Sequence, residues 1–306
     1  YEFVGALVGY ADNSMIEGIS IKDNFFVKVE EDYCGGLVGR AKDSTIKNIS
    51  GDASITISSW RYSGVIVGSS KDSDISDVHI RGTIIANSDY DTAGGLIGVI
   101  SNTAEHSVKN CSVVSEETGY VKSPSNVGGL IGNCSGETNI SQCYAKIPVK
   151  GTNYLGGLVG SFTSGNIINC HSNCDLTAEG SVNFVGGLVG KCSGNVATSY
   201  AEGNIRLNCT NASYIGTMIG FLGSSSSVEK SFTAVNISVA DGYTPTLQRH
   251  YVPSNSNIPL WWLEDDDYIY NTSGTNYVSE GYKESLNWDS DVWDNLTEGA
   301  LPTLKN

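Results

Sequence analysis

Cysteine recurs along this chain at one position of a pattern that repeats about every 30 residues. That position is first apolar and then a thiol: Ile49, Val78, Cys111, Cys143 and Cys170. Free cysteine is among the most buried residue types, so the column predicts reduced thiols stacked in a core. A disulfide between Cys174 and Cys209 is the alternative in an exported protein. A zinc site at Cys170 and Cys174 would need a second pair, and the sequence offers no convincing one.

Asp43 and Asp72 occupy a second recurring position, at the first turn of their repeats. If successive repeats stack as strands, the two carboxylates lie about 4.8 Å apart, and a calcium ion could bridge them. Aspartate also favours turns on its own account, because its side chain bonds to nearby backbone groups. Both interpretations stay open: a calcium or ligand-binding site, or a pair of turn residues.

Histidine is the remaining candidate for acid–base chemistry, and its four copies are scattered: His79, His106, His171 and His250. None belongs to an HExxH, GxSxG or triad-like spacing, so we expect surface or turn positions. The best argument for an enzyme is one 34-residue repeat that gathers four titratable residues: Glu105, His106, Glu116 and Glu117. A glycosidase would need paired carboxylates at a defined separation, and elsewhere the acids are dispersed.

An internal repeat with a five-residue core of glycine and apolar residues positions these side chains. Its eight copies read GALVG, GGLVG, GVIVG, GGLIG, GGLIG, GGLVG, GGLVG and GTMIG, beginning at Gly5, Gly35, Gly64, Gly94, Gly128, Gly156, Gly186 and Gly216. Successive copies begin 28–34 residues apart, which indicates a repeat array that grows by stacking.

Between the cores lie short runs rich in Val, Ile, Thr and Tyr, separated by Gly, Asn, Asp and Ser. Helix-period spacing and helix caps are missing, and about three short strands fit in one repeat. The sequence therefore predicts an all-β fold, a parallel β-solenoid of about eight turns over residues 1–240. We expect a right-handed β-helix, because right-handed crossovers dominate between parallel strands.

Stacking would convert each aligned position into a column of similar side chains. Two residues before the first glycine, six of the eight repeats have an aromatic ring: Phe3, Tyr33, Tyr62, Tyr154, Phe184 and Tyr214. The other two repeats have Thr92 and Asn126 there. The glycines themselves predict a left-handed turn or the close approach of another segment. The adjacent Leu and Val columns would point to opposite faces of a flat strand. Either a bend turns both inward, or another element covers the outer one.

The net charge of the chain argues against two classes of partner, nucleic acids and anionic membranes. With 18 basic and 33 acidic residues, the net charge is −15, which repels phosphate backbones and anionic lipid. No apolar run approaches the ~18 residues of a transmembrane helix. We therefore expect no nucleic-acid partner and no membrane insertion, and we expect a monomer.

The GGLVG core, the 30-residue period and the phrases Ile168-Asn169-Cys170 and Ser199-Tyr200 resemble the GLUG-repeat family. The resemblance covers roughly residues 1–240, and the closing segment 287–304 is similar to the Trp-rich end of such arrays. GLUG repeats occur in bacterial surface proteins, including adhesin-like proteins and non-catalytic regions of immunoglobulin A peptidases. The resemblance implies an extracellular, non-catalytic module at the bacterial cell surface, and it names no ligand.

Residues 241–306 differ in composition from the repeats and hold four of the five tryptophans: Trp261, Trp262, Trp288 and Trp293. We predict that this segment is a C-terminal cap, because the last turn of a solenoid otherwise exposes unpaired strand edges. The alternative is a platform for carbohydrate stacking, in which Trp261 and Trp262 would contact the ligand.

Taken together, these patterns predict a non-catalytic extracellular repeat module, adhesin-like or structural. It would bind a glycan or a surface protein through its lateral face, without a cofactor other than calcium at Asp43 and Asp72. The alternative is a carbohydrate-active β-helix enzyme, since polysaccharide lyases and glycosidases also use parallel solenoids. We expect no enzyme, because the strand columns are apolar or small throughout the array.

Overall fold

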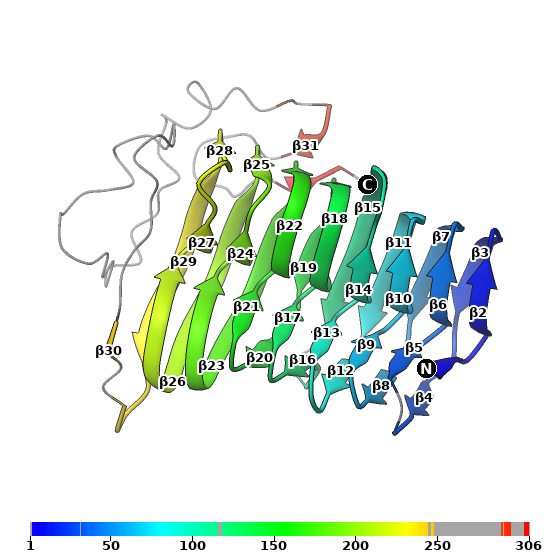
Figure 1. The fold of residues 1–306 in the computed structure, drawn as a ribbon, viewed down its shortest axis with the longest axis horizontal. Helices are drawn as coiled ribbons and strands as arrows, with labels where there is room; N and C mark the ends of the chain where they lie inside the picture. Colours follow the sequence, from blue (N-terminus) through cyan, green and yellow to red (C-terminus); the bar gives the residue numbers. More distant parts are fainter. Residues whose placement is uncertain are drawn as a thin grey trace.

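The computed structural model describes residues 2–30, 32–115, 118–243, 246–247, 289, 291–294 and 303–305. Within these residues the chain forms strands and turns without a helix, and 30 strands join in one sheet. Each strand pairs in parallel with a strand one repeat later, as Phe3 pairs with Tyr33 and Tyr33 with Tyr62. The chain is therefore a parallel β-solenoid with one turn for each of the eight motif copies (Figure 1), which confirms the predicted all-β fold.

The first four turns contain four strands each. In chain order these are β1 (Phe3–Gly5), β2 (Val8–Asp12), β3 (Met15–Ile21), β4 (Phe25–Lys28); β5 (Tyr33–Gly35), β6 (Val38–Lys42), β7 (Thr45–Asp52), β8 (Ile55–Ser59); β9 (Tyr62–Gly64), β10 (Val67–Lys71), β11 (Asp74–Gly82), β12 (Ile84–Ser88); β13 (Thr92–Gly94), β14 (Ile97–Ser101), β15 (His106–Ser115) and β16 (Tyr120–Ser123). The prediction of three strands per turn is wrong for these turns, because the motif itself bends. Gly36 and Leu37 separate β5 from β6 where the sequence reads as one apolar run.

In the later turns some neighbouring strands merge. The strands are β17 (Asn126–Gly128), β18 (Ile131–Ser141), β19 (Tyr144–Lys146), β20 (Val149–Gly151); β21 (Tyr154–Gly156), β22 (Val159–Ile168), β23 (His171–Gly186); β24 (Val189–Cys192), β25 (Asn195–Ala197), β26 (Tyr200–Gly216); β27 (Ile219–Leu222), β28 (Val228–Glu229), β29 (Phe232–Val239) and β30 (Thr246–Leu247). Strand β23 runs for 16 residues and passes from one turn into the motif of the next. A separate antiparallel pair follows, β31 (Trp293–Asp294) with β32 (Thr303–Leu304).

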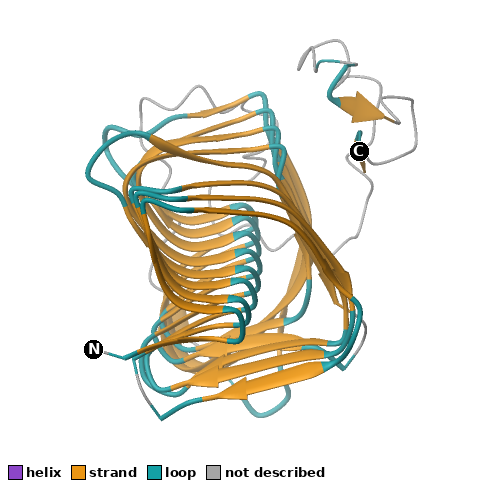
Figure 2. Ribbon diagram, turned by 90° about the vertical axis from the view of Figure 1, so that its right-hand side faces the viewer, coloured by secondary structure: helices purple, strands orange, loops and turns teal. Residues whose placement is uncertain are grey.

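The glycine motif is a bend that points into the coil, as the inner column of loops in Figure 2 shows. A Cβ on Gly35 would overlap the carbonyl oxygen of Val38, and a Cβ on Gly39 would lie 2.5 Å from the nitrogen of Val4 on the preceding turn. Neither glycine has a positive φ. Glycine is therefore required here because another backbone segment approaches closely, and not because the chain makes a left-handed turn. Leu37 and Val38 are both buried, because the bend turns both columns inward.

Two other corners of the coil use a residue with positive φ followed by a small side chain. The pairs are Asn13-Ser14, Asp43-Ser44 and Asp72-Ser73 at one corner, and Asn110-Cys111, Gln142-Cys143, Asn169-Cys170 and Thr198-Ser199 at the other. In two earlier turns the second corner has Asn48 and Asp77 with positive φ, followed by the larger Ile49 and Val78. Ser44 illustrates the bonding: its hydroxyl accepts the Ser14 N–H at 3.1 Å and donates to the Lys42 carbonyl at 2.6 Å. The corners therefore satisfy their backbone groups without extra loop residues.

The interior of the coil is one continuous apolar core. One of its columns runs through six turns with exposures of 1% or less: Ile46, Ile75, Val108, Ile140, Ile167 and Val196. Register pairs join these residues directly from turn to turn. Branched side chains stacked in this way hold the turns in fixed register, so the outer side chains project from a rigid frame.

Candidate functional site

Asp43 and Asp72 lie at the same corner of neighbouring turns, and the Asp43 N–H donates to the carbonyl of Lys71 at 3.1 Å. Both are turn residues, with φ values of 49° and 47°. The Asp43 carboxylate lies 3.1 Å from the ammonium of Lys42. The Asp72 carboxylate accepts the N–H of Thr103 at 2.5 Å and its hydroxyl at 2.8 Å. The turn role left open by the sequence is therefore present, and both carboxylates already have partners.

The hydrogen bonds to Asp72 also set its protonation. Partial burial raises the pKa of the Asp72 carboxyl, but the bonds from Thr103 outweigh this and hold the pKa below its usual range. Among the described residues, no three His, Cys, Asp or Glu side chains are arranged to hold a metal ion. Calcium binding at Asp43 and Asp72 stays a prediction, with two carboxylates as its only charged ligands.

All eight cysteines are free and buried, as the thiol column predicted, and the Cys174–Cys209 disulfide is not formed. The column is directly bonded: the Cys143 N–H donates to the sulfur of Cys170 at 3.4 Å, and the Cys170 N–H donates to the Ser199 hydroxyl at 3.1 Å. Cysteine and serine side chains thus both accept a backbone N–H from the preceding turn at this corner, and the later turn has serine.

Burial makes three of the thiols outside this column poor nucleophiles. It raises the pKa of Cys134, Cys174 and Cys192 to about 12 in each case. A thiol with that pKa is almost wholly protonated at neutral pH, and the thiolate is the reactive form. Cys143 is the exception: burial acts to raise its pKa, but the hydrogen bonds with Cys111 and Cys170 hold the pKa well below its usual range. The thiol of Cys143 is nevertheless buried in the core, as are the other seven.

Two of the four titratable residues of the irregular repeat are described, and Glu105 and His106 lie against different partners. The Glu105 carboxylate accepts a hydrogen bond from Asn139 at 2.6 Å. His106 lies 3.6 Å from the Asp74 carboxylate, and the Ser107 hydroxyl donates to that same carboxylate at 2.8 Å. Because Ser107 bonds to the carboxylate, it lacks an imidazole base to take its proton. The other two candidates, Glu116 and Glu117, lie outside the described residues.

Of the four tail tryptophans, three lie outside the described residues: Trp261, Trp262 and Trp288. The sugar-stacking role expected of Trp261 and Trp262 therefore stays a prediction. Trp293 is described, and it packs against the side of the solenoid with 1% of its surface exposed. Its indole N–H lies 3.4 Å from the amide oxygen of Asn169, which is 124 residues earlier in the chain. A capping role for the whole segment 241–306 likewise stays a prediction.

Trp293 covers a stack of rings on three successive turns. The His171 ring lies 4.9 Å from Tyr144 and 4.8 Å from Tyr200, and it is parallel to both within 3°. Trp293 lies across His171 and Tyr200, at 5.9 and 5.8 Å. The expectation that the histidines occupy surface or turn positions is wrong for His171, which is 8% exposed. Burial lowers its pKa to about 3, so the ring is neutral at physiological pH.

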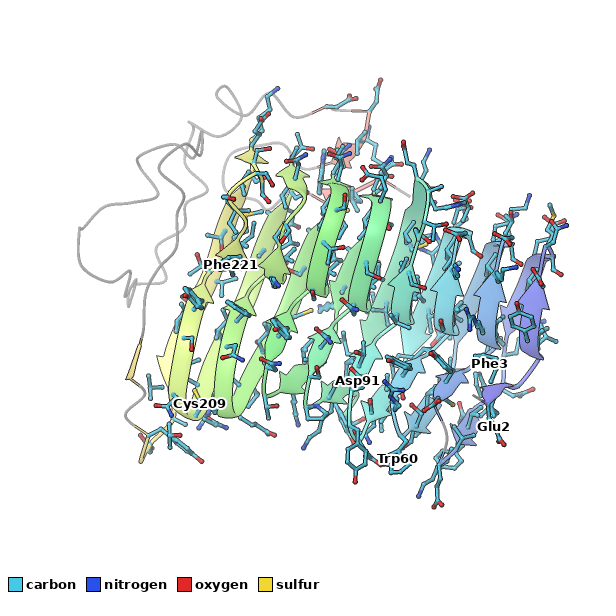
Figure 3. All side chains as sticks on the ribbon, in the orientation of Figure 1. Glu2, Phe3, Trp60, Asp91, Cys209 and Phe221 are labelled. Carbon is cyan, nitrogen blue, oxygen red and sulfur yellow. The ribbon has the colours of Figure 1, made fainter. Side chains whose placement is uncertain are left out.

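The aromatic column before the glycine bend lies on the outer face of the coil, with its rings half-buried. Ring centroids are 4.7 Å apart between Tyr33 and Tyr62, and 5.1 Å apart between Phe184 and Tyr214. The stacking predicted from the sequence is confirmed. Because stacked rings cover one another's faces, this column offers mainly ring edges to a ligand. Figure 3 marks Phe3 near one end of the column and Phe221, which packs on Phe184 and Tyr214, near the other.

Several rings outside these stacks are open to solvent, Phe26 at 63% exposure among them, and two of the others form a pair. Trp60 follows β8 with 49% of its surface exposed, and Tyr90 follows β12 with 65% exposed. They lie on neighbouring turns, since the Tyr90 N–H donates to the Trp60 carbonyl at 2.9 Å. We call this pair the outer corner. This pair was not predicted from the sequence, where the tail tryptophans were the expected aromatic platform; its signal is Tyr90 one period after Trp60.

Comparison with known proteins gives limited matches. No family model matches the chain, so membership of the GLUG family stays a prediction. Halomucin from Haloquadratum walsbyi is 27% identical over 181 residues, which cover 53% of this chain and 2% of halomucin. A solved Bacteroides ovatus structure, described as a "putative immunoglobulin A1 protease", has a TM-score of 0.38 and 16% identity, and the match covers 77% of this chain and 62% of that one.

Among the described residues, the side chains that a ligand could reach lie on the side faces of the coil. No helix among those residues has the length and apolar character of a membrane span. Polar and charged groups on the faces pair mostly with the next turn, as the salt bridge between Lys47 and Glu17 does at 3.1 Å. The outer corner differs, because its two rings project from the turn-to-turn stacking.

Proposed function

We propose that the chain is a non-catalytic extracellular repeat module, a stiff rod that presents its side faces to a glycan or a surface protein. The observation that carries the proposal is the continuous strand pairing along the sheet, which is interrupted only locally by register shifts between Cys134 and Glu137 and between Gly180 and Ser181. Strand pairs continue from the first turn to the last, from Phe3 and Tyr33 to Ala212 and Leu247. A rod of this kind keeps its outer side chains at fixed spacings, which favours repeated or multivalent contact with an extended partner.

A binding role fits the residues better than catalysis. An enzyme built on a solenoid places its acid, base or cations in one cleft at defined separations. Here all eight thiols are buried, Glu105 is bonded to Asn139, and Ser107 is bonded to Asp74. The proposal that the chain is no enzyme rests on these pairings.

The GLUG resemblance and the similarity to halomucin support an extracellular location. The free thiols are compatible with an extracellular location, because all eight are buried and so shielded from oxidants in solution. The chain spans a small part of halomucin's length, so the proposal concerns this segment alone.

The test has two arms, run on the purified chain. In the first, the protein is applied to an array of neutral and acidic glycans and to immobilised extracellular proteins, and retention is measured. In the second, it is incubated with the same polysaccharides, and new reducing ends and unsaturated uronates are assayed. We expect retention on the arrays and no product. Release of product by the pure chain would contradict a non-catalytic role, and retention on neither array would contradict a binding role.

A further inference from the structure

The outer corner combines two open aromatic rings with a firmly held backbone. The ring centroids of Trp60 and Tyr90 are 5.1 Å apart, and their planes meet at 84°. In such an edge-to-face pair, at most one face of one ring is covered by the other, so broad ring surface remains free. Figure 3 places Trp60 at the lower edge of the coil, and in the chain it comes directly after β8.

The backbone that carries these rings is fixed from both sides. The Ser88 hydroxyl donates to the carbonyl of Arg61 at 2.6 Å and accepts the N–H of Asp91 at 3.1 Å. The Arg61 guanidinium lies 3.3 Å from Asp91 and 3.8 Å from Asp32, so it links three turns. A ligand would meet rings that are already in place and would lose little affinity to ordering them.

Polar acceptors and donors adjoin the rings. Asn87 and Asp89 lie just before Tyr90, and the Asn87 amide donates to the Asp89 carboxylate at 2.8 Å. Both side chains keep hydrogen-bonding capacity beyond that one bond, since a carboxylate accepts several bonds and an amide has four sites. An aromatic face beside an amide and a carboxylate matches a pyranose ring, which has an apolar face of C–H groups and a rim of hydroxyls.

We propose that the outer corner is a binding site for a neutral oligosaccharide, with Trp60 stacking on one sugar ring and Tyr90 on its edge or on the next ring. The proposal names the ligand class within the binding role proposed above and rests on it. Charge argues for a neutral sugar, because the chain carries a net charge of −15. Asp89 and Asp91 flank Tyr90 in the chain, and Arg61, which follows Trp60, pairs with Asp91 and Asp32, so three carboxylates outnumber one cation here. An anionic glycan would be repelled there.

The size of the corner also favours a sugar over a protein. A stable protein interface buries about 800 Å² on each partner and involves 20–30 residues a side. Two half-exposed rings present a few hundred Å² at most, since an aromatic side chain has about 150–250 Å² in total. That area suits one or two sugar rings.

The experiment measures binding of soluble hexasaccharides by isothermal titration calorimetry, using β-1,4-glucan, β-1,3-glucan, α-1,4-glucan, β-1,4-mannan and, as the acidic probe, oligogalacturonate. Variants are Trp60→Ala, Trp60→Phe and Tyr90→Ala. Tyr10→Ala is the matched control, because Tyr10 is 46% exposed on β2, at another face. We expect at least one neutral probe to bind. Its affinity should be reduced about 10-fold or more in Trp60→Ala, reduced in Tyr90→Ala, partly kept in Trp60→Phe and within about 2-fold of the parent chain in Tyr10→Ala.

Each outcome decides between the two proposals. Neutral binding that Trp60→Ala leaves unchanged, or binding of oligogalacturonate alone, overturns the site and leaves the binding role of the rod intact. Retention of an extracellular protein with no glycan bound does the same. Failure to bind any glycan or protein overturns both. An unfolding curve for each variant shows that a lost affinity is not lost folding.

Discussion

The glycine bend and the outer corner lie on the same turns of the coil, but they are built in opposite ways. At the bend, the first and last motif residues are glycine in all eight copies, because backbone packs directly on backbone. At the outer corner, Trp60 and Tyr90 project into solvent, and the next turn has Pro124 and Ser125 at the corresponding place. One column allows no side chain, and the other changes from turn to turn.

The difference shows where fold and binding reside in a repeat of this kind. A position that touches the turn before and the turn after cannot change without disturbing both. A side chain beyond the stack can change without that cost, so specificity can be placed there. Substitutions at the two kinds of position should therefore separate stability from binding.

The largest effect is expected at the bend. In Gly64→Ala the new Cβ would overlap the Val67 carbonyl oxygen and lie 2.5 Å from the nitrogen of Gly98 on the next turn. Both contacts are backbone, so the coil must shift, and we expect a loss of about 3–5 kcal/mol in the free energy of unfolding. Urea unfolding followed by circular dichroism measures it.

The matched control is Gly18→Asn, at a corner where φ is 70° and no atom approaches the missing Cβ. The aligned residue of the next turn is Asn48, with φ of 55°. Asparagine tolerates this conformation, so we expect a change within about 0.5 kcal/mol. Equal effects of the two substitutions would contradict the special role of the bend.

The next effect is expected at the ring stack under Trp293, where the buried His171 makes stability depend on pH. The folded state keeps His171 neutral down to about pH 3, whereas the unfolded chain takes up a proton near pH 6.5. The contribution of His171 is therefore present above pH 6.5 and is lost as pH falls toward 3, by up to about 1.4 kcal/mol per pH unit. His171→Phe keeps a ring in the stack and should flatten the pH dependence of unfolding. The same slope in both proteins would show that His171 titrates normally.

The thiol column predicts a smaller, chemically selective effect. In Cys170→Ser the hydroxyl can still accept the Cys143 N–H and donate to the Ile168 carbonyl, as Ser199 does one turn later. In Cys170→Ala both bonds are lost inside the core, so we expect it to be less stable than the serine variant by about 1–2 kcal/mol. Urea midpoints give the order. An alanine variant as stable as the serine variant would mean that the column is held by packing alone.

The smallest effect is expected from calcium at Asp43 and Asp72. Lys42 and Thr103 already occupy their carboxylates, so adding calcium or a chelator should move the melting temperature by less than about 1 °C. Differential scanning fluorimetry measures the shift. A rise of several degrees that disappears in Asp72→Asn would establish the bridging site instead.

The sequence predicted the coil well because stacking repeats its instructions in every turn. Columns such as Cys111, Cys143 and Cys170 were assigned to the core from spacing alone, and the thiols are free and buried. The inward direction of the glycine bend was left open, since alternation along a strand cannot reveal a bend between Gly36 and Leu37. The fourth strand per turn was missed for the same reason.

The contacts that sequence could not predict join segments without a periodic relation. Trp293 reaches Asn169 across 124 residues, and no repeat spacing connects them. Burial of His171 depends on that contact as well as on Tyr144 and Tyr200. The outer corner was predictable in principle from Trp60 and Tyr90, one period apart, but their exposure depends on a corner that only the folded coil defines.

If the glycine bend stabilises the fold and the outer corner binds the ligand, Trp60→Ala should change affinity without changing stability. Stability and affinity for the best neutral hexasaccharide should be measured on the same preparation. We expect an unfolding free energy within about 0.5 kcal/mol of the parent chain, because Trp60 is half exposed, together with an affinity reduced about 10-fold or more. A stability loss of several kcal/mol with affinity unchanged would contradict it.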